Sequence, residues 1–268
     1  MNNNQNVPQS DEQAPWFMAT LANGLKILDA LADGPLTISE IRERTGLQRS
    51  ALYRLVRTLE VCGYLRRRSF DGRLQVGYKV WEVGASVQRS VEVSEVAGQV
   101  VRRLATELGE SVHLAVYNSG DVIYIDKADG SNPVRSYTRL GGRAPSYCVA
   151  TGKVMLAHQD REEIDRVIVA GLNPYTQETI TDRDLLLHEL QQVRDRNIAV
   201  NRGEWREGVS GLAVPVRELG GTVVAALGFS GPTARILPSI AILEVALRSG
   251  AAEVSGELGY ATPHQITS

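Results

Sequence analysis

The sequence predicts an α+β protein of two domains, a small helical domain with a β-hairpin followed by a larger domain built on a mostly antiparallel sheet. Three observations lead to this fold class. A length of 268 residues is enough for two domains. Three short helical patterns and a hairpin signal occupy residues 21–77. Beyond residue 92, strand-like runs alternate with helical patterns, as expected of an α+β domain.

Composition is that of a globular protein, with 43% hydrophobic and 22% charged residues. No segment approaches the roughly 18 apolar residues that span a bilayer, so we expect no membrane partner. Residues 1–15 are rich in Asn, Gln and Pro and predict a disordered tail, not a signal peptide. Cys62 and Cys148 have neither a disulfide framework nor metal-ligand spacing. We therefore expect a cytoplasmic protein without metal or cofactor.

Charge is distributed unevenly along the chain. The formal net charge is −2, yet residues 41–80 hold ten Lys and Arg against three Asp and Glu. A local excess of +7 in an otherwise acidic chain indicates a surface that binds a polyanion. On charge alone, an ordinary solvated basic surface is an equally good interpretation.

Three helices are predicted in quick succession. In the first, Leu21, Leu25, Leu28 and Leu31 recur at helical spacing, and Asp33-Gly34-Pro35 ends the segment. The second begins at Thr37, which with Glu40 has capping-box spacing, and ends at Gly46. The third covers residues 48–62, with one apolar stripe formed by Leu52, Leu55, Val56 and Leu59.

The polar face of the third helix and the following hairpin predict a winged helix-turn-helix that binds double-stranded DNA. Arg, Ser and Tyr opposite a leucine stripe suit the major groove. Two short strands around Asp71-Gly72 form a wing whose arginines could touch phosphates. The alternative is a three-helix bundle with a hairpin and no DNA role. The predicted contacts are Gln48, Arg49, Ser50, Tyr53, Arg54, Arg57, Arg66, Arg67, Arg68 and Arg73.

The chain resembles the IclR family of bacterial transcriptional regulators from Trp16 to Tyr260. The resemblance rests on the motifs Asn23–Leu28, Gly46–Leu55, Gly63-Tyr64-Leu65, Tyr78-Lys79-Val80, Leu140–Pro145, Thr151-Gly152-Lys153, Leu212–Val216 and Gly228–Pro232. It implies a GAF-like effector-binding domain and dimers joined through the N-terminal domains, often paired into tetramers. It also implies a regulator, most often a repressor, of an adjacent catabolic operon with a palindromic operator.

The expected boundaries are a tail at 1–15, the winged domain at 16–79, a linker helix at 80–92, the effector domain at 93–260 and a tail at 261–268. In the effector domain we expect helices to one side of the sheet and at its ends. The predicted helices cover residues 93–108, 147–157, 162–170, 182–196 and 238–258. The predicted strands cover residues 112–117, 122–126, 134–138, 198–201, 211–216 and 223–229.

The resemblance also implies an effector site at the helix that follows the Gly141-Gly142 loop. Backbone N–H groups near a helix start favour an anionic or oxygen-rich group. Relatives often have an acidic residue at the position of Asn201 and Cys at that of Gly211, which predicts a carboxylic acid or related carbonyl compound with an apolar part. His113 shares a strand face with Tyr117, but a structural role is the commoner one for such a histidine. The implied site residues are Ala150, Thr151, Asn201, Gly211, Ser136, Ala144 and Val209.

Catalytic motifs are incomplete, so we expect no enzyme. Gly152-Lys153 lacks the other residues of a phosphate-binding loop, because Tyr147 and Val154 occupy the required positions. Residues 208–211 lack the spacing of a nucleophile elbow, and the four histidines are scattered. The competing class is a small-molecule hydrolase or binding protein whose winged segment serves only oligomerisation.

Overall fold

The computed structural model describes residues 15–83, 92–134 and 138–260. Contacts between Cα atoms divide the chain into two compact units, residues 1–90 and 91–268. Each unit has its own hydrophobic core. Among the described residues, no helix combines the length and apolarity needed to cross a bilayer.

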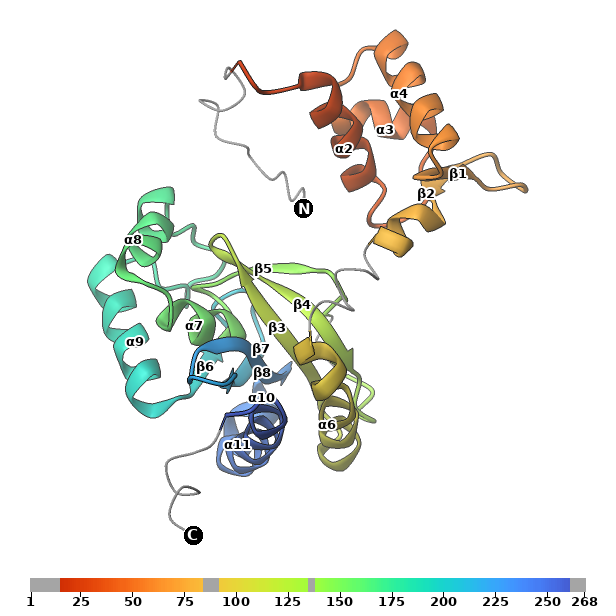
Figure 1. Ribbon diagram of the computed structural model, residues 1–268. Coiled ribbons are helices and arrows are strands. Elements are labelled where there is room, and N and C mark those ends of the chain that lie inside the picture. Colours follow the sequence, from red (N-terminus) through yellow and green to blue (C-terminus); the bar gives the residue numbers. More distant parts are fainter. Residues whose placement is uncertain (1–14, 84–91, 135–137, 261–268) are drawn as a thin grey trace. The chain divides into compact units, whose positions relative to one another are not determined.

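The N-terminal unit contains the three predicted helices, α2 (Ala19–Ala30), α3 (Ile38–Thr45) and α4 (Arg49–Val61). An antiparallel pair, β1 (Leu65–Arg67) and β2 (Leu74–Val76), follows them, and residues 78–83 are helical (Figure 1). Both halves of the predicted capping box form, since Glu40 N–H donates to Thr37 Oγ1 and Thr37 N–H donates to Glu40. Gly46 ends α3 at φ = +70°, a conformation that suits glycine.

The leucines that recur at helical spacing in α2 do not all face the core. Ile27 and Leu31 are fully buried against α4 and the hairpin strands. Leu21 and Leu25 are 62% and 54% exposed. Because successive helical residues are rotated by about 100°, the face that carries Ile27 and Leu31 turns Leu21 and Leu25 toward solvent. The first helix therefore buries one apolar face and leaves a second one open.

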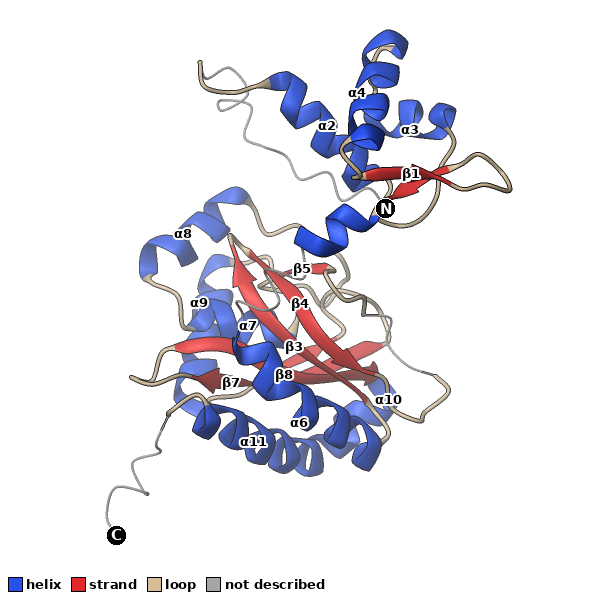
Figure 2. Cartoon of the chain, turned by 45° about the vertical axis from the view of Figure 1, so that its right-hand side comes forward, coloured by secondary structure: helices blue, strands red, loops and turns tan. Residues whose placement is uncertain are grey.

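The C-terminal unit is built on one antiparallel sheet of six strands in the order β5-β4-β3-β8-β7-β6 (Figure 2). Neighbouring strands in this order are antiparallel to each other. The strands are β3 (Ser111–Asn118), β4 (Asp121–Ala128), β5 (Arg143–Pro145), β6 (Ala199–Arg202), β7 (Val209–Arg217) and β8 (Val223–Pro232).

Helices cover both faces of this sheet, so the expectation that they lie to one side and at its ends is wrong. On one face lie α6 (Glu92–Leu108) and α11 (Ile240–Glu257), which share a core with Leu114, Leu212 and Leu227. On the other lie α7 (Ala150–Ala157), α8 (Arg161–Ala170) and α9 (Arg183–Arg196), packed on Ala115, Ala213 and Ala226. Leucine and alanine alternate along the central strands, which lets α7 approach the sheet closely.

Several boundaries differ from the predicted ones. The helix expected from Tyr147 begins at Ala150, with Val149 as its N-cap and a turn before it. The short strand β5 was not predicted, because three residues carry too little alternation to be recognised. Most of the strand expected at residues 134–138 lies outside the described residues. A short helix, α10 (Thr233–Ile236), and a 3₁₀ turn, Leu237–Ser239, precede α11.

Candidate DNA interface and effector site

Helix α4 presents a basic polar face to solvent, as the sequence predicts. Leu52 and Val56 are buried in the core of the unit. Gln48, at the N-cap, is exposed, and so are the five polar residues predicted to face DNA: Arg49, Ser50, Tyr53, Arg54 and Arg57. The guanidinium of Arg49 lies over the ring of Tyr53, 5.8 Å from its centroid. The helix can therefore lay this face against DNA without repacking its core.

Three of the four predicted wing arginines contact residues of the N-terminal unit that lie outside the wing. Arg67 Nε lies 2.8 Å from Glu60 Oε1. Arg73 donates to the carbonyl of Pro35 and lies 3.2 Å from Glu40 Oε2. Hydrogen bonds from Thr37 lower the pKa of the Glu40 carboxyl below its usual value, and Arg73 adds to the effect. The guanidinium of Arg66 packs on the ring of Tyr78, 4.6 Å from its centroid. These contacts fix the base of the wing beside α3 and α4.

In the C-terminal unit, the start of α7 is buried and lacks a side-chain cap. Val149 is the N-cap and its side chain supplies no hydrogen bond. Ala150 and Thr151, the first two residues of the helix, are both buried. An uncapped helix start inside a protein favours a ligand group that accepts hydrogen bonds from backbone N–H.

Small residues of the sheet lie directly opposite this helix start. A Cβ atom added to Gly211 would stand 3.8 Å from Ala150 Cβ and 3.8 Å from Ser230 Cβ. One added to Gly228 would stand 3.1 Å from Thr151 Cγ2. The structure therefore brings Ala150, Thr151 and Gly211 together, as the resemblance implies.

Three polar atoms on this face are buried without a hydrogen-bond partner among the described residues: His113 Nδ1, Thr151 Oγ1 and Ser230 Oγ. The Thr151 hydroxyl lies close enough to Tyr124 to oppose the rise that burial causes in the pKa of the phenol, but the pair does not have hydrogen-bond geometry. An unpaired buried polar atom costs free energy unless a ligand or water satisfies it. These atoms make this face of the sheet a candidate site for a molecule with hydrogen-bonding groups.

Burial keeps His113 and Tyr124 uncharged near pH 7. Desolvation lowers the pKa of His113 to about 4, and the charge of Lys127 acts in the same direction. Desolvation raises the pKa of Tyr124 to about 12. The two rings meet edge to face with centroids 5.1 Å apart. The site can therefore offer donors and acceptors without a full charge from either residue.

Three of these groups were not among the predicted site residues: Ser230, Tyr124 and His113. Strand alternation carries the missing signal, since His113 lies two residues before Ala115 and Ser230 four residues after Ala226, both of which pack under α7. The sequence favoured a structural role for His113. The structure turns it toward the same face as α7, with one ring nitrogen unpaired.

Asn201 lies beside the site but has a structural task of its own. It pairs with Gly211 across β6 and β7. Its Oδ1 accepts hydrogen bonds from the backbone N–H groups of Gly203 and Glu204, at 3.0 and 2.9 Å. Only its amide nitrogen remains as a group that could meet an effector.

Of the other three predicted effector residues, the structure describes two. Ala144 in β5 is buried in the core beneath α7 and pairs with Val122. Val209 begins β7, pairs with Pro232 and is half-buried. Ser136 lies outside the described residues.

A buried ion cluster lies one helical turn further along α7. Lys153 is 1% exposed, and its ammonium donates to Glu189 Oε1 at 3.0 Å, Glu204 Oε1 at 2.8 Å and the carbonyl of Val200 at 3.2 Å. Burial raises the pKa of Glu204, and Lys153 opposes that rise. The cluster ties α7 to α9 and to the turn that Asn201 holds.

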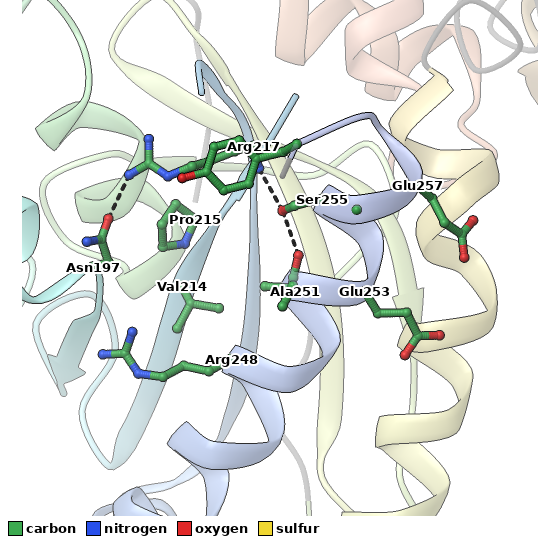
Figure 3. Close-up of a pocket in the computed structure, with 12 residues that line it drawn as sticks. Asn197, Val214, Pro215, Arg217, Arg248, Ala251, Glu253, Ser255 and Glu257 are labelled. Atoms are coloured by element: carbon green, nitrogen blue, oxygen red, sulfur yellow. Dashed lines mark hydrogen bonds between the residues drawn. The ribbon is translucent and has the colours of Figure 1, made fainter. Parts of the chain in front are cut away.

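A separate groove of about 640 Å³ lies between β7 and the C-terminal half of α11 (Figure 3). Arg217 donates from its side chain to Asn197 Oδ1 and from its backbone to Ser255 Oγ. Arg248 donates to Glu244 and to the carbonyl of Arg196. None of the predicted effector residues lines this groove, and its two arginines already have acceptors.

Comparison with known families decides the identity. Residues 20–69 match the family described as "IclR helix-turn-helix domain", and residues 85–256 match "Bacterial transcriptional regulator IclR C-terminal". The chain belongs to the IclR family of transcriptional regulators. It is 31% identical over 252 residues to the regulator KdgR of Escherichia coli K12, covering 93% of this chain and 96% of KdgR. It is 30% identical over 255 residues to the repressor AllR of the same strain, covering 94% of each chain.

Solved IclR structures share the fold. The IclR protein of Thermotoga maritima is 31% identical, with a TM-score of 0.74 over 91% of this chain and all of that one. An IclR homologue of Microbacterium hydrocarbonoxydans, solved with 4-hydroxybenzoate, is 25% identical, with a TM-score of 0.80 over 91% of this chain and all of that one. The expected fold class, a winged helix-turn-helix followed by an effector-type IclR domain, is confirmed.

Proposed function

We propose that this regulator is a repressor of a catabolic operon and that a small organic effector, bound between α7 and the sheet, controls its hold on DNA. The observation that carries the proposal is the set of three unpaired polar atoms opposite an uncapped helix start. The repressor AllR and the homologue solved with 4-hydroxybenzoate support it. In this scheme the protein acts in the cytoplasm and catalyses no reaction.

The effector class follows from the lining of the site. A carboxylate or carbonyl group would accept hydrogen bonds from the start of α7 and from Thr151. The small residues Ala150, Gly211 and Gly228 present apolar surface beside it, since a Cβ atom added to Gly211 would stand 3.8 Å from Ala150 Cβ. Ser230 and neutral His113 would meet a second polar group, such as a ring hydroxyl. This lining suits an aromatic or similarly apolar carboxylic acid.

On the DNA side, α4 would lie in the major groove and read bases through Arg49 and Arg54. Gln48, Ser50, Tyr53 and Arg57 would contact bases or the backbone beside them. One winged unit covers few base pairs, so specific binding normally needs two units on a palindromic site. We infer a dimer or a tetramer. The apolar face of α2 that carries Leu21 and Leu25, exposed in the single chain, supports a contact between N-terminal units.

Selection of binding sites from a random-sequence DNA library by the full-length protein tests this proposal. We expect an enriched palindromic sequence, bound with an affinity that falls steeply as salt rises. Calorimetric titration with a panel of aromatic and aliphatic carboxylic acids, 4-hydroxybenzoate included, should find a ligand that changes this affinity. Failure to enrich any sequence would reject the proposed DNA role, and absence of any carboxylate ligand would reject the effector class.

A further inference from the structure

The loop between β6 and β7 is anchored at its start by hydrogen bonds to both sides of its backbone. The N–H groups of Gly203 and Glu204 donate to Asn201 Oδ1. The carbonyls of the same two residues accept hydrogen bonds from Thr176 Oγ1, at 2.8 Å, and from Thr179 Oγ1, at 2.7 Å. The two residues that follow in the chain therefore start from a fixed backbone.

These two residues, Trp205 and Arg206, form a stacked pair. Trp205 is partly buried and packs against the core cluster that contains Ala150 and Tyr124. The guanidinium carbon of Arg206 lies 4.4 Å from the centroid of the Trp205 ring, within the range of a cation–π contact. Arg206 itself is exposed. Because the ring is fixed against the core, stacking restricts the arginine to few rotamers and reduces the entropy that it loses on binding an anion.

The charge of Arg206 reaches the candidate effector site. It opposes the rise that burial causes in the pKa of Tyr124, and the Thr151 side chain acts on the same phenol in the same direction. Both groups therefore lie near the hydroxyl of Tyr124. A carboxylate that accepts a hydrogen bond from Thr151 would interact with the charge of Arg206 as well.

The other charges beside α7 make a cation at this place important for an anionic ligand. Lys153 faces two carboxylates, those of Glu189 and Glu204, so the buried cluster is negative overall when all three groups are ionised. Such a cluster would repel an anion bound at the start of α7. His113 does not offset this repulsion, because desolvation lowers its pKa to about 4. Arg206 brings positive charge to the site from the loop.

We propose that Arg206, stacked on Trp205, binds the carboxylate of the effector and so selects anionic effectors over neutral molecules of the same shape. A guanidinium group matches a carboxylate with two parallel hydrogen bonds. Thr151 and the start of α7 would meet one side of the carboxylate, and Arg206 the other. The inference rests on the proposed effector-binding function and deepens it by naming the residue that recognises the charge.

The test compares carboxylates with neutral molecules of the same shape, using the full-length protein. Calorimetric titration pairs each carboxylate of the panel above with its primary amide, beginning with 4-hydroxybenzoate and 4-hydroxybenzamide. We expect the wild type to bind the carboxylate about ten-fold more tightly than the amide, the value of one charge-assisted hydrogen bond. Arg206→Gln should weaken carboxylate binding about ten-fold and leave amide binding within about two-fold. Arg206→Lys keeps the charge and should retain part of the preference.

Controls separate a recognition role from a structural one. Arg202→Gln replaces another exposed arginine, at the end of β6, and should keep the wild-type preference. Thermal melting of Arg206→Gln should match that of the wild type, because the side chain is exposed. Unchanged carboxylate affinity in Arg206→Gln, or an equal loss for carboxylate and amide, would overturn the role of Arg206 and leave the proposed function standing. If no carboxylate binds the wild type, the proposed effector class fails and this inference fails with it.

Discussion

The two units place their functional atoms in opposite environments. In the winged unit the candidate contacts are arginines and neutral polar residues, all exposed or half-buried, and they come from residues 48–73, a single stretch of chain. In the effector unit they are neutral, buried and drawn from separate elements, with His113 on β3, Thr151 on α7 and Ser230 on β8. Residues that contact DNA can come from one local sequence pattern. The residues of a small-molecule site come instead from strands and helices that are distant in the sequence and meet only in the fold.

This contrast predicts that ion pairs in the two units contribute very different amounts to the free energy of unfolding. Lys153→Met removes the cation at the centre of the buried cluster and leaves Glu204 uncompensated, which should cost about 3–5 kcal/mol of unfolding free energy. Lys79→Met, which breaks an exposed pair with Glu82 in the winged unit, should leave the free energy of unfolding almost unchanged, because water screens this pair. Denaturant unfolding followed by circular dichroism measures both.

The deficit of Lys153→Met should depend on pH. Burial already raises the pKa of Glu204, and loss of Lys153 removes a group that lowers it. Below its usual pKa the carboxyl is protonated in both states, so the penalty is smallest. As pH rises, the folded state must keep a proton that the unfolded state has released, so stability falls. A deficit that is equal at about pH 5 and pH 8 would contradict the buried environment assigned to Glu204.

On the exposed side, the largest effect should follow from replacing both predicted base-reading arginines. Arg49→Ala with Arg54→Ala should cost about 1–3 kcal/mol of sequence discrimination for each bidentate hydrogen-bond pair to a base that the variant can no longer form. Stability should change little, because both side chains are exposed. Gel shifts on selected and scrambled duplexes measure the discrimination, with Arg161→Ala on α8 of the other unit as a control. Intact operator affinity in the double variant would show that α4 is not the reading helix.

The same contrast explains how much of each unit could be predicted from the sequence. Helix α4 was predicted within one residue at each end, because its leucine stripe and polar face repeat with the helical period. The wing arginines were predicted as phosphate contacts, but their pairing with Glu40, Glu60 and Tyr78 depends on tertiary packing. Leu21 and Leu25 have a perfect helical spacing and still face solvent, because periodicity does not say which of two apolar faces is covered.

In the effector unit the family resemblance supplied Ala150, Thr151 and Gly211, which local patterns could not have joined. Ser230 and Tyr124 went unrecognised because neither differs locally from any serine or tyrosine in a strand. Their significance appears only when β4 and β8 are placed under α7. Asn201 was predicted as an effector contact, and no local signal reveals that its oxygen holds the turn at Gly203.

A larger side chain at position 211 should separate the functions of the two units. Gly211→Leu would project a side chain from a Cβ position 3.0 Å from the carbonyl oxygen of Phe229 and 3.8 Å from Ala150 Cβ, and should abolish binding of the carboxylate identified by titration. Gly211→Ala, which fills less space, should weaken it about ten-fold, since overpacking typically costs about 1–3 kcal/mol. DNA binding should survive in both, so Gly211→Leu should remain on its operator in the presence of effector. Unchanged effector affinity would place the pocket elsewhere.

The smallest expected effect comes from removing the Thr151 hydroxyl. It is also the most specific, because the change should not destabilise the effector-free protein but should weaken effector binding. Thr151→Val keeps the shape of the side chain and removes a buried hydroxyl that has no partner among the described residues. Such a replacement should leave the stability of the effector-free protein unchanged or raise it slightly. The same change should weaken effector binding by about 0.5–1.5 kcal/mol, the value of one hydrogen bond. Ser230→Ala should behave alike, whereas Thr179→Val, whose hydroxyl donates to the carbonyl of Glu204, should lose stability. Thermal melting and calorimetric titration of the three variants give both signs, and a loss of stability in Thr151→Val would mean that its hydroxyl is already satisfied within the protein.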